Sequence, residues 1–344
     1  MLPFLNRASS FPKVAQRTCS AILLAGGLFL AACSKDHESG APALTPDAVM
    51  FTQTGLYPEG VQYDAANSRF LVSSLTTGAI GQVRDDGTYT AFADGSALVS
   101  TVGLNLDEPR NRLLAAVSDP GYNSRRTNLS TKGKLAQLAI FNRNSPQLAP
   151  IVLDLGGLRP NAPGHFANDI AVDTRGNIYV TDSFAPVIYK IDPTQVVTVF
   201  AENPQFAAPA GSFGLNGIVF HPDGYLLVAK SDEGILFKIP LNNPSGFTRV
   251  ATGQNLQGAD GMRLQENNIL QVVTNAQAKV YRLSTTDSWA TASVTGTFTT
   301  PPQYPTTLAR RDGSDGYVLY SNLNALQASR LPPVSQFTIT KVKF

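Results

Sequence analysis

One short pattern recurs six times between about residue 56 and residue 325 of the 344-residue chain. Each copy has a lead residue, a short strand of alternating apolar and polar residues, a turn rich in Asp, Gly or Asn, and a second strand. This order predicts an antiparallel hairpin. Three clear copies are "EGVQYDAANSRFLVSS" from Glu59, "NDIAVDTRGNIYVTDS" from Asn168 and "NGIVFHPDGYLLVAKS" from Asn216.

Further strand-like segments follow the hairpins, such as "VIYKIDP" and "VVTVFAE" after the copy at Asn168. Four strands in a unit of about 40 to 50 residues are typical of a β-propeller blade. The copies contain no long segment of helical periodicity, which argues against an α/β barrel. We therefore expect an all-β fold over residues 49–344: a six-bladed β-propeller with four-stranded antiparallel blades around a central channel. Either "VMFTQTG" near Val49 or the terminal "QFTITKVKF" could complete the last blade.

The second repeat is about 20 residues longer than its neighbours. The extra residues lie around "DPGYNSRRTNLSTKGKLAQ", which is basic and rich in Ser, Thr and Asn. Such an insertion is typical of a surface loop. It could form a lid over one face of the propeller, or it could be an ordinary solvated loop.

The first 32 residues have the composition of a targeting segment. Arg7, Lys13 and Arg17 precede the apolar stretch "AILLAGGLFLAA", which is short for a membrane span. This stretch ends in "LAAC" and resembles a bacterial lipoprotein signal, in which Cys33 would be lipidated and become the mature N-terminus. An ordinary secretory signal with an incidental Cys33 is the alternative.

A lipoprotein signal has consequences for the rest of the chain. Residues 33–48 would be a flexible tether, and the protein would lie in the bacterial cell envelope. Ser34 is of the kind that often directs a lipoprotein to the outer membrane, so we expect the periplasm-facing side of that membrane. Both cysteines, Cys19 and Cys33, lie at or before the cleavage point, so the mature chain would have no disulfide framework.

Charge excludes one class of partner. The formal net charge of the whole chain is +2, and residues 1–32 hold three basic and no acidic residues, which leaves −1 for the remainder. A nearly neutral chain lacks the large basic field that binds nucleic acid. We expect a monomer that contacts the membrane through its lipid anchor and binds a small molecule.

The lead residues of the repeat suggest a site. Inner strands of a propeller line the central channel, so equivalent residues of successive blades face one another across its axis. The lead residues are Glu59, Val102, Asn168, Asn216, Asp260 and Thr306. The two carboxylates would repel each other unless they were protonated, paired or bridged by a cation, and no Lys or Arg holds a lead position.

A metal ion would resolve this repulsion. We predict a channel metal held by Glu59, Asn168, Asn216 and Asp260. Ligation by oxygen atoms alone favours a hard cation, Ca²⁺ first, with Mg²⁺ or Mn²⁺ also compatible. The alternative is a hydrated polar channel without an ion.

The same segments resemble the calcium-dependent six-bladed propeller family of gluconolactonase and regucalcin, to which diisopropyl-fluorophosphatase and the paraoxonases are related. "PEGVQYD", "ANDIAVD", "LNGIVFHPDG" and "ADGMRL" supply the four predicted ligands in the blade order of that family. The resemblance implies metal-dependent hydrolysis of a lactone or related ester, with the metal polarising the carbonyl group. It implies that Asp260 acts as base or nucleophile and that Glu59 is mainly a ligand.

The chain departs from the family beside the blade-three ligand. Gluconolactonase-like members usually have an Arg two residues before this Asn, whereas Phe166 stands here, which favours a more apolar substrate. His165 could orient substrate or transfer protons, or it could be a surface loop histidine. Asp169 follows Asn168 in an alternating strand, so we expect its side chain to face away from the axis and to hydrogen-bond a neighbouring loop or blade.

A second class of function stays open. Propellers also serve as binding and scaffold proteins, so the fold alone does not establish catalysis. The alternative is therefore a non-catalytic, lipid-anchored propeller whose loops bind a partner.

Overall fold

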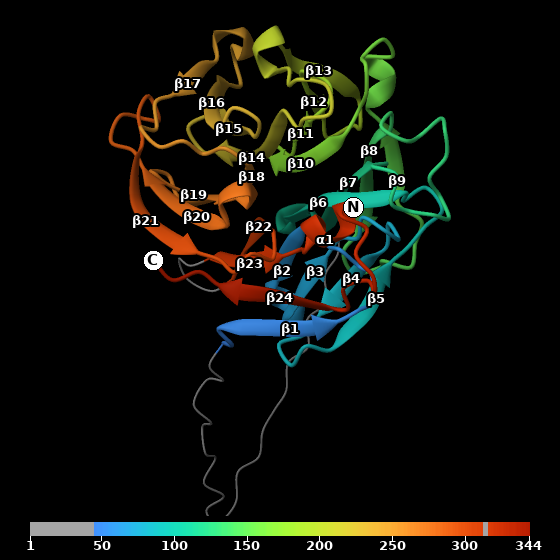
Figure 1. The fold of residues 1–344 in the computed structure, drawn as a ribbon. Coiled ribbons are helices and arrows are strands. Elements are labelled where there is room, and N and C mark those ends of the chain that lie inside the picture. Colours follow the sequence, from blue (N-terminus) through green and yellow to red (C-terminus); the bar gives the residue numbers. More distant parts are fainter. Residues whose placement is uncertain (1–44, 312–315) are drawn as a thin grey trace, which may run out of the picture. The chain divides into compact units, whose positions relative to one another are not determined.

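The computed structural model describes residues 45–311 and 316–344. The predicted signal segment 1–32, the predicted lipidation site Cys33 and all but the last residues of the predicted tether lie outside the described residues. The described strands form six antiparallel sheets of four strands each, which confirms the predicted six-bladed β-propeller. Figure 1 shows the six sheets arranged in a ring.

Blades one to three follow the chain in order. Their strands are β2 (Val61–Asp64), β3 (Arg69–Val72), β4 (Ile80–Val83), β5 (Tyr89–Ala93), β6 (Ser100–Asp107), β7 (Arg112–Ser118), β8 (Ala136–Asn142), β9 (Ile151–Asp154), β10 (Ala167–Val172), β11 (Ile178–Asp182), β12 (Val187–Ile191) and β13 (Val197–Glu202). In each blade the first strand is innermost and the fourth is outermost.

Blades four and five repeat this arrangement, and blade six ends the chain. Their strands are β14 (Leu215–His221), β15 (Tyr225–Lys230), β16 (Ile235–Pro240), β17 (Thr248–Val250), β18 (Ala259–Glu266), β19 (Ile269–Thr274), β20 (Lys279–Ser284), β21 (Ser293–Thr299), β22 (Pro305–Arg310), β23 (Gly316–Tyr320) and β24 (Gln336–Lys341). Among the described residues the helices are short: the α-helix α1 (Leu323–Gln327) and 3₁₀ turns at Ala65–Asn67, Glu108–Arg110, Gly156–Leu158, Pro204–Phe206, Pro244–Gly246 and Asn275–Gln277. None of these helices is long and apolar enough to cross a membrane.

The ring closes through both ends of the described chain. Strand β1 (Ala48–Thr52) pairs antiparallel with β24, so blade six has the order β22-β23-β24-β1. The two segments that we predicted as alternatives are therefore both used, β24 as the third strand and β1 as the outermost. Figure 1 shows β1 lying along the outer side of β24.

The second strands hold the core between the blades. Every residue of β11, β15 and β23 is buried, because neighbouring blades cover both faces of these strands. Complete burial of a large apolar side chain stabilises the fold by roughly 1.5–3 kcal/mol. Burial of these second strands between neighbouring blades therefore holds the blades in the ring and the inner strands around the channel.

The inner strands of blades two to six share an irregularity near their start. In β10, Ala167 pairs with Asp182 and Ile170 pairs with Val180, so Asn168 and Asp169 lie opposite the single residue Thr181. The same shift in register occurs in β6, β14, β18 and β22. Such a β-bulge leaves two consecutive residues out of the alternating pattern. The lead residue of the repeat is the first of these two.

Candidate metal and catalytic site

A cavity of about 570 Å³ opens among the inner strands. Its lining includes all four predicted ligands, Glu59, Asn168, Asn216 and Asp260, and each of these side chains is buried. Repeats that are far apart in the sequence are thus brought together at one end of the channel. The last three residues each occupy the first position of a bulge, which turns their side chains toward the axis.

The two amide ligands have unsatisfied oxygen atoms. Asn168 Oδ1 and Asn216 Oδ1 are buried and have no hydrogen-bond partner among the described residues. Asn168 Nδ2 donates to Ser183 Oγ at 2.9 Å, so the amide oxygen is the atom left over. A buried acceptor without a partner costs about 1–3 kcal/mol. A cation bound by both oxygens would remove this cost.

The two carboxylate ligands lack a compensating charge. Neither Glu59 nor Asp260 forms an ion pair with a described Lys, Arg or His. Burial raises the pKa of Glu59 well above its ordinary value, and the charges of Asp260 and Asp169 raise it further. Burial also raises the pKa of Asp260 to about 7, although hydrogen bonds from Asn275 and Asn216 act in the opposite direction.

These donors fit a hard divalent cation. The described residues contain no group of three or more His, Cys, Asp or Glu side chains arranged to hold a metal by themselves. A complete ligand set therefore needs the amide oxygens of Asn168 and Asn216 beside the carboxylates of Glu59 and Asp260. Carboxylate and amide oxygens are ligands that Ca²⁺ prefers.

The expected orientation of Asp169 was wrong in one respect. Asp169 lines a second, smaller cavity along the inner strands, and its negative charge raises the pKa of both Glu59 and Asp260. The bulge at Asn168 interrupts the alternation, so both residues of the pair turn toward the channel. The expected bond to a neighbouring blade is confirmed, because Ile218 N donates to Asp169 Oδ2 at 3.2 Å.

Two residues that orient the ligands were not predicted. Ser183 and Asn275 occupy equivalent positions after the second strands of blades three and five, where their backbone N–H groups donate to Phe166 O and Gly258 O. Ser183 Oγ accepts the bond from Asn168, and Asn275 Nδ2 donates to Asp260 Oδ2 at 2.8 Å. The equivalent endings of the repeats, "VTDS" and "VVTN", were the available sequence signal.

His165 lies outside the cavity lining. It is buried, with Nδ1 at 2.8 Å from Asp182 Oδ2 and Nε2 at 3.1 Å from Arg159 O. Burial alone lowers the pKa of His165, but the hydrogen bond and charge of Asp182 outweigh this effect and raise it. Both ring nitrogens are engaged by the surrounding structure, so His165 is neither an exposed loop histidine nor in contact with the cavity.

One wall of the cavity is aromatic. Phe166, Phe184 and Phe213 line it and contact one another, with ring centroids 5.1–5.4 Å apart. Phe166 occupies the position at which gluconolactonase-like members usually have an Arg. The cavity therefore offers apolar surface beside the predicted metal ligands.

The blade-two insertion forms another part of the lining. Pro120, Tyr122, Lys132 and Gly133 of this segment face the cavity. The two expectations were a lid over one face and an ordinary solvated loop; the insertion lines the cavity, as a lid would.

Solved structures share this fold at low sequence identity. No protein-family model and no curated protein sequence matches the chain. The crystal structure of the Malassezia sympodialis allergen Mala s 1 superposes with a TM-score of 0.68 at 17% identity, covering 87% of this chain and 96% of the allergen. A gluconolactonase of Xanthomonas campestris gives a TM-score of 0.56 at 16% identity, with 86% and 91% of the two chains covered.

A lyase has the same fold. The virginiamycin B lyase of Staphylococcus aureus gives a TM-score of 0.54 at 12% identity, covering 86% of this chain and 99% of the lyase. An allergen, a lactonase and a lyase are thus built on one architecture, so the activity must be argued from the site. The chain has the six-bladed β-propeller fold of these proteins, gluconolactonase included.

Proposed function

We propose that this protein is a divalent-metal-dependent hydrolase of a lactone or related ester, with Ca²⁺ as its metal. The observation that carries the proposal is the convergence of two unsatisfied amide oxygens and two unpaired carboxylates in one cavity. The gluconolactonase among the solved structures of the same fold supports the reaction class.

The four lead side chains would hold the ion. When bound, Ca²⁺ would polarise the carbonyl group of the substrate and stabilise the negative charge that develops on its oxygen. Glu59, Asn168 and Asn216 serve as ligands. Asp260 is also a ligand and, in its ionised form, acts as the base or nucleophile of the hydrolysis, with its carboxylate held by Asn275 at 2.8 Å.

The aromatic wall favours an apolar substrate. Phe166, Phe184 and Phe213 pack against the apolar part of the ligand and exclude water from the cavity. A sugar lactone would find no cationic side chain at position 166. We therefore expect aryl or alkyl lactones and esters to be better substrates than aldonolactones.

The test is hydrolysis of dihydrocoumarin with and without chelator. EDTA should abolish turnover, and Ca²⁺ should restore it. Asp260→Ala should lower kcat/KM by at least about 100-fold, whereas Asp223→Ala, in an exposed hairpin turn, should have no effect. Turnover that is indifferent to both EDTA and Asp260→Ala would refute the proposal.

The same experiment distinguishes the non-catalytic alternative. A binding or scaffold propeller would show calorimetric binding of Ca²⁺ or of a small apolar ligand without turnover of any lactone or ester. Loss of Ca²⁺ binding in Asn216→Ala would then identify the same ligands in a structural role.

We also propose that Cys33 is lipidated and anchors the propeller in the bacterial cell envelope, on the periplasmic side of the outer membrane. The "LAAC" motif after a short apolar stretch supports this localisation. Cys33→Ala should move the protein from the membrane fraction to the soluble periplasmic fraction. Unchanged fractionation of the variant would contradict it.

A further inference from the structure

The blade-two insertion, residues 119–135, joins β7 to β8 beside the cavity. It brings both an aromatic and a cationic side chain, Tyr122 and Lys132, to the cavity lining. A loop that lines a site selects ligands only if the surrounding structure holds it in place.

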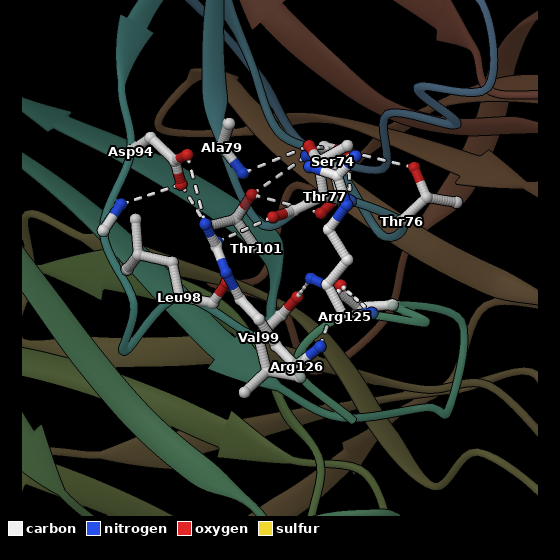
Figure 2. Close-up of polar contacts among 12 residues, drawn as sticks. Ser74, Thr76, Thr77, Ala79, Asp94, Leu98, Val99, Thr101, Arg125 and Arg126 are labelled. Atoms are coloured by element: carbon white, nitrogen blue, oxygen red, sulfur yellow. Dashed lines mark hydrogen bonds and ion pairs between the residues drawn. The ribbon is translucent and has the colours of Figure 1, made fainter. Parts of the chain in front are cut away.

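The insertion is fixed to blade one. Arg126 Nη1 donates to Thr77 O and to Leu98 O, each at 2.8 Å, and Arg126 also pairs with Asp94. Asn123 Nδ2 donates to Val99 O at 2.6 Å. Figure 2 shows Arg125 and Arg126 of the insertion next to the blade-one segment that carries these acceptors.

The insertion is also fixed internally and to blade three. The carboxylate of Asp119 accepts hydrogen bonds from Thr127 and Thr131 hydroxyl groups, both at 2.6 Å. Gly133 N donates to Asp119 O, and Gly133 O accepts from His165 N at 2.9 Å. The backbone of the segment between these anchors, which includes Lys132, is therefore fixed in place as a wall of the cavity.

The side-chain stem of Lys132 lies close to the backbone of Gly121. Gly121 has a φ of +94°, and a Cβ added there would lie 2.6 Å from Lys132 Cε. The absence of a side chain at Gly121 thus lets the lysine stem lie over the loop. Among the described lining residues Lys132 is the one Lys, Arg or His. Its ammonium group has no hydrogen bond or ion pair with another described residue.

The rest of the cavity lining presents more apolar than polar surface. Besides the three phenylalanines, it includes Leu75, Val102, Tyr304, Leu323 and Leu326. Lys132 is itself exposed, so its pairing with an anion resembles a surface ion pair and contributes about 1 kcal/mol at most, which is about fivefold in affinity. The wall therefore combines an apolar surface with one unpaired positive charge.

We propose that the blade-two insertion selects the substrate, with Lys132 pairing with an anionic group, such as a carboxylate, on an otherwise apolar lactone or ester. The inference rests on the proposed hydrolase function and specifies its substrate class. Lys132 is a specificity-determining residue in this proposal, since it binds a group remote from the acyl carbon.

The experiment compares phenyl acetate with 4-carboxyphenyl acetate, two esters that differ by one carboxylate. Lys132→Gln should lower kcat/KM for the carboxylated ester about fivefold more than for the neutral one. The difference should appear as a higher KM for the carboxylated ester. Lys132→Glu should increase this difference. The matched control is Lys134→Gln. Lys134 belongs to the same insertion and is exposed like Lys132, but it does not line the cavity, so its substitution should leave the ratio unchanged.

Two further measurements distinguish failure of this inference from failure of the proposed hydrolase function. Calorimetric titration with benzoate and benzamide reports carboxylate binding without turnover, so it tests Lys132 even if neither ester is hydrolysed. Arg126→Ala, which releases the insertion from blade one, should weaken benzoate binding while leaving the affinity for Ca²⁺ unchanged. Equal losses for the charged and neutral ligands in Lys132→Gln, or a carboxylate preference that does not depend on Lys132, would overturn the inference.

Discussion

Asn168 and Ser183 are joined by a 2.9 Å hydrogen bond in which the amide of Asn168 donates. Ser183 Oγ in turn donates to Leu215 O at 2.5 Å, which commits its proton to blade four. The serine oxygen can therefore only accept from Asn168, and this fixes which amide atom is left without a partner. The predicted metal ligand is thus oriented by a residue that would not touch the metal.

Removal of this bond should weaken the metal site. In Ser183→Ala the amide of Asn168 is free to turn, so we expect the affinity for Ca²⁺ to fall by about tenfold, as for other residues that orient metal ligands. Calorimetric titration with Ca²⁺ measures the change. Ser321→Ala removes the equivalent serine of blade six, which bonds Tyr304 O and no predicted ligand, and serves as control. Equal affinities of the two variants would show that Ser183 has no orienting role.

The bond from Asn275 to Asp260 should set the pH dependence of hydrolysis. Asn275 Nδ2 donates to the Asp260 carboxylate and lowers its pKa, against the larger effect of burial. Asn275→Ala should therefore raise the pKa of Asp260, so that its ionised form is populated only at higher pH. We expect the acid limb of the kcat/KM profile to move up by about one pH unit. An unmoved limb would mean that Asp260 is not the group that titrates.

Metal-free protein should lose stability as the pH rises. The pKa of Asp260 is about 7 in the folded protein, whereas an unfolded aspartate titrates near pH ~3.9. A raised pKa stabilises the fold fully below the unfolded value, and this contribution is lost as the pH rises through the folded value. Relative to Asp260→Asn, the metal-free wild type should therefore lose roughly 5 °C of Tm between pH 4 and pH 8.

Calcium supplies the complementary measurement. It should raise the Tm of the wild type at pH 8 and much less at pH 4, because protons compete with the ion for the same carboxylates. A Ca²⁺ effect that is equal at both pH values would indicate binding elsewhere.

The aromatic wall should be visible in substrate preference. Phe166 is 4% exposed and packs against Phe184 and Phe213. Phe166→Ala should raise KM for dihydrocoumarin by about 30-fold, because roughly 2 kcal/mol of apolar contact is lost, with a smaller effect on kcat. The control is Phe200→Ala, which removes a ring in edge-to-face contact with Tyr179, away from the cavity.

Closure of the ring should depend on β1. A chain that begins at Thr45 retains the pairing of β1 with β24, and we expect its Tm to lie within about 2 °C of that of the chain that starts at Cys33. Removal of residues through Thr52 deletes the buried apolar side chains of Val49 and Phe51 and exposes the edge of β24. We expect a loss of at least 3 kcal/mol in the free energy of unfolding, measured by urea denaturation. Equal stability of the two chains would assign closure to β24 alone.

The sequence by itself determined the blades and the residues that face one another. Alternation of apolar residues and the Asp, Gly and Asn turns are local signals, so each hairpin could be predicted from its own residues. The position of Glu59, Asn168, Asn216 and Asp260 at one point of the repeat then placed them around the axis, because equivalent residues of a ring meet at its centre.

Only the tertiary structure decided the features that depend on distant contacts. The bulge at Asn168 brings Asp169 to the channel against the alternation rule, because the extra residue is set by pairing with β11. Burial of His165 depends on Asp182 and the carbonyl group of Arg159, and the wall formed by the insertion depends on acceptors in blade one. Ring closure by β1 joins residues almost 300 positions apart. These pairings are selected by packing across the whole ring, and no local pattern in the sequence specifies them.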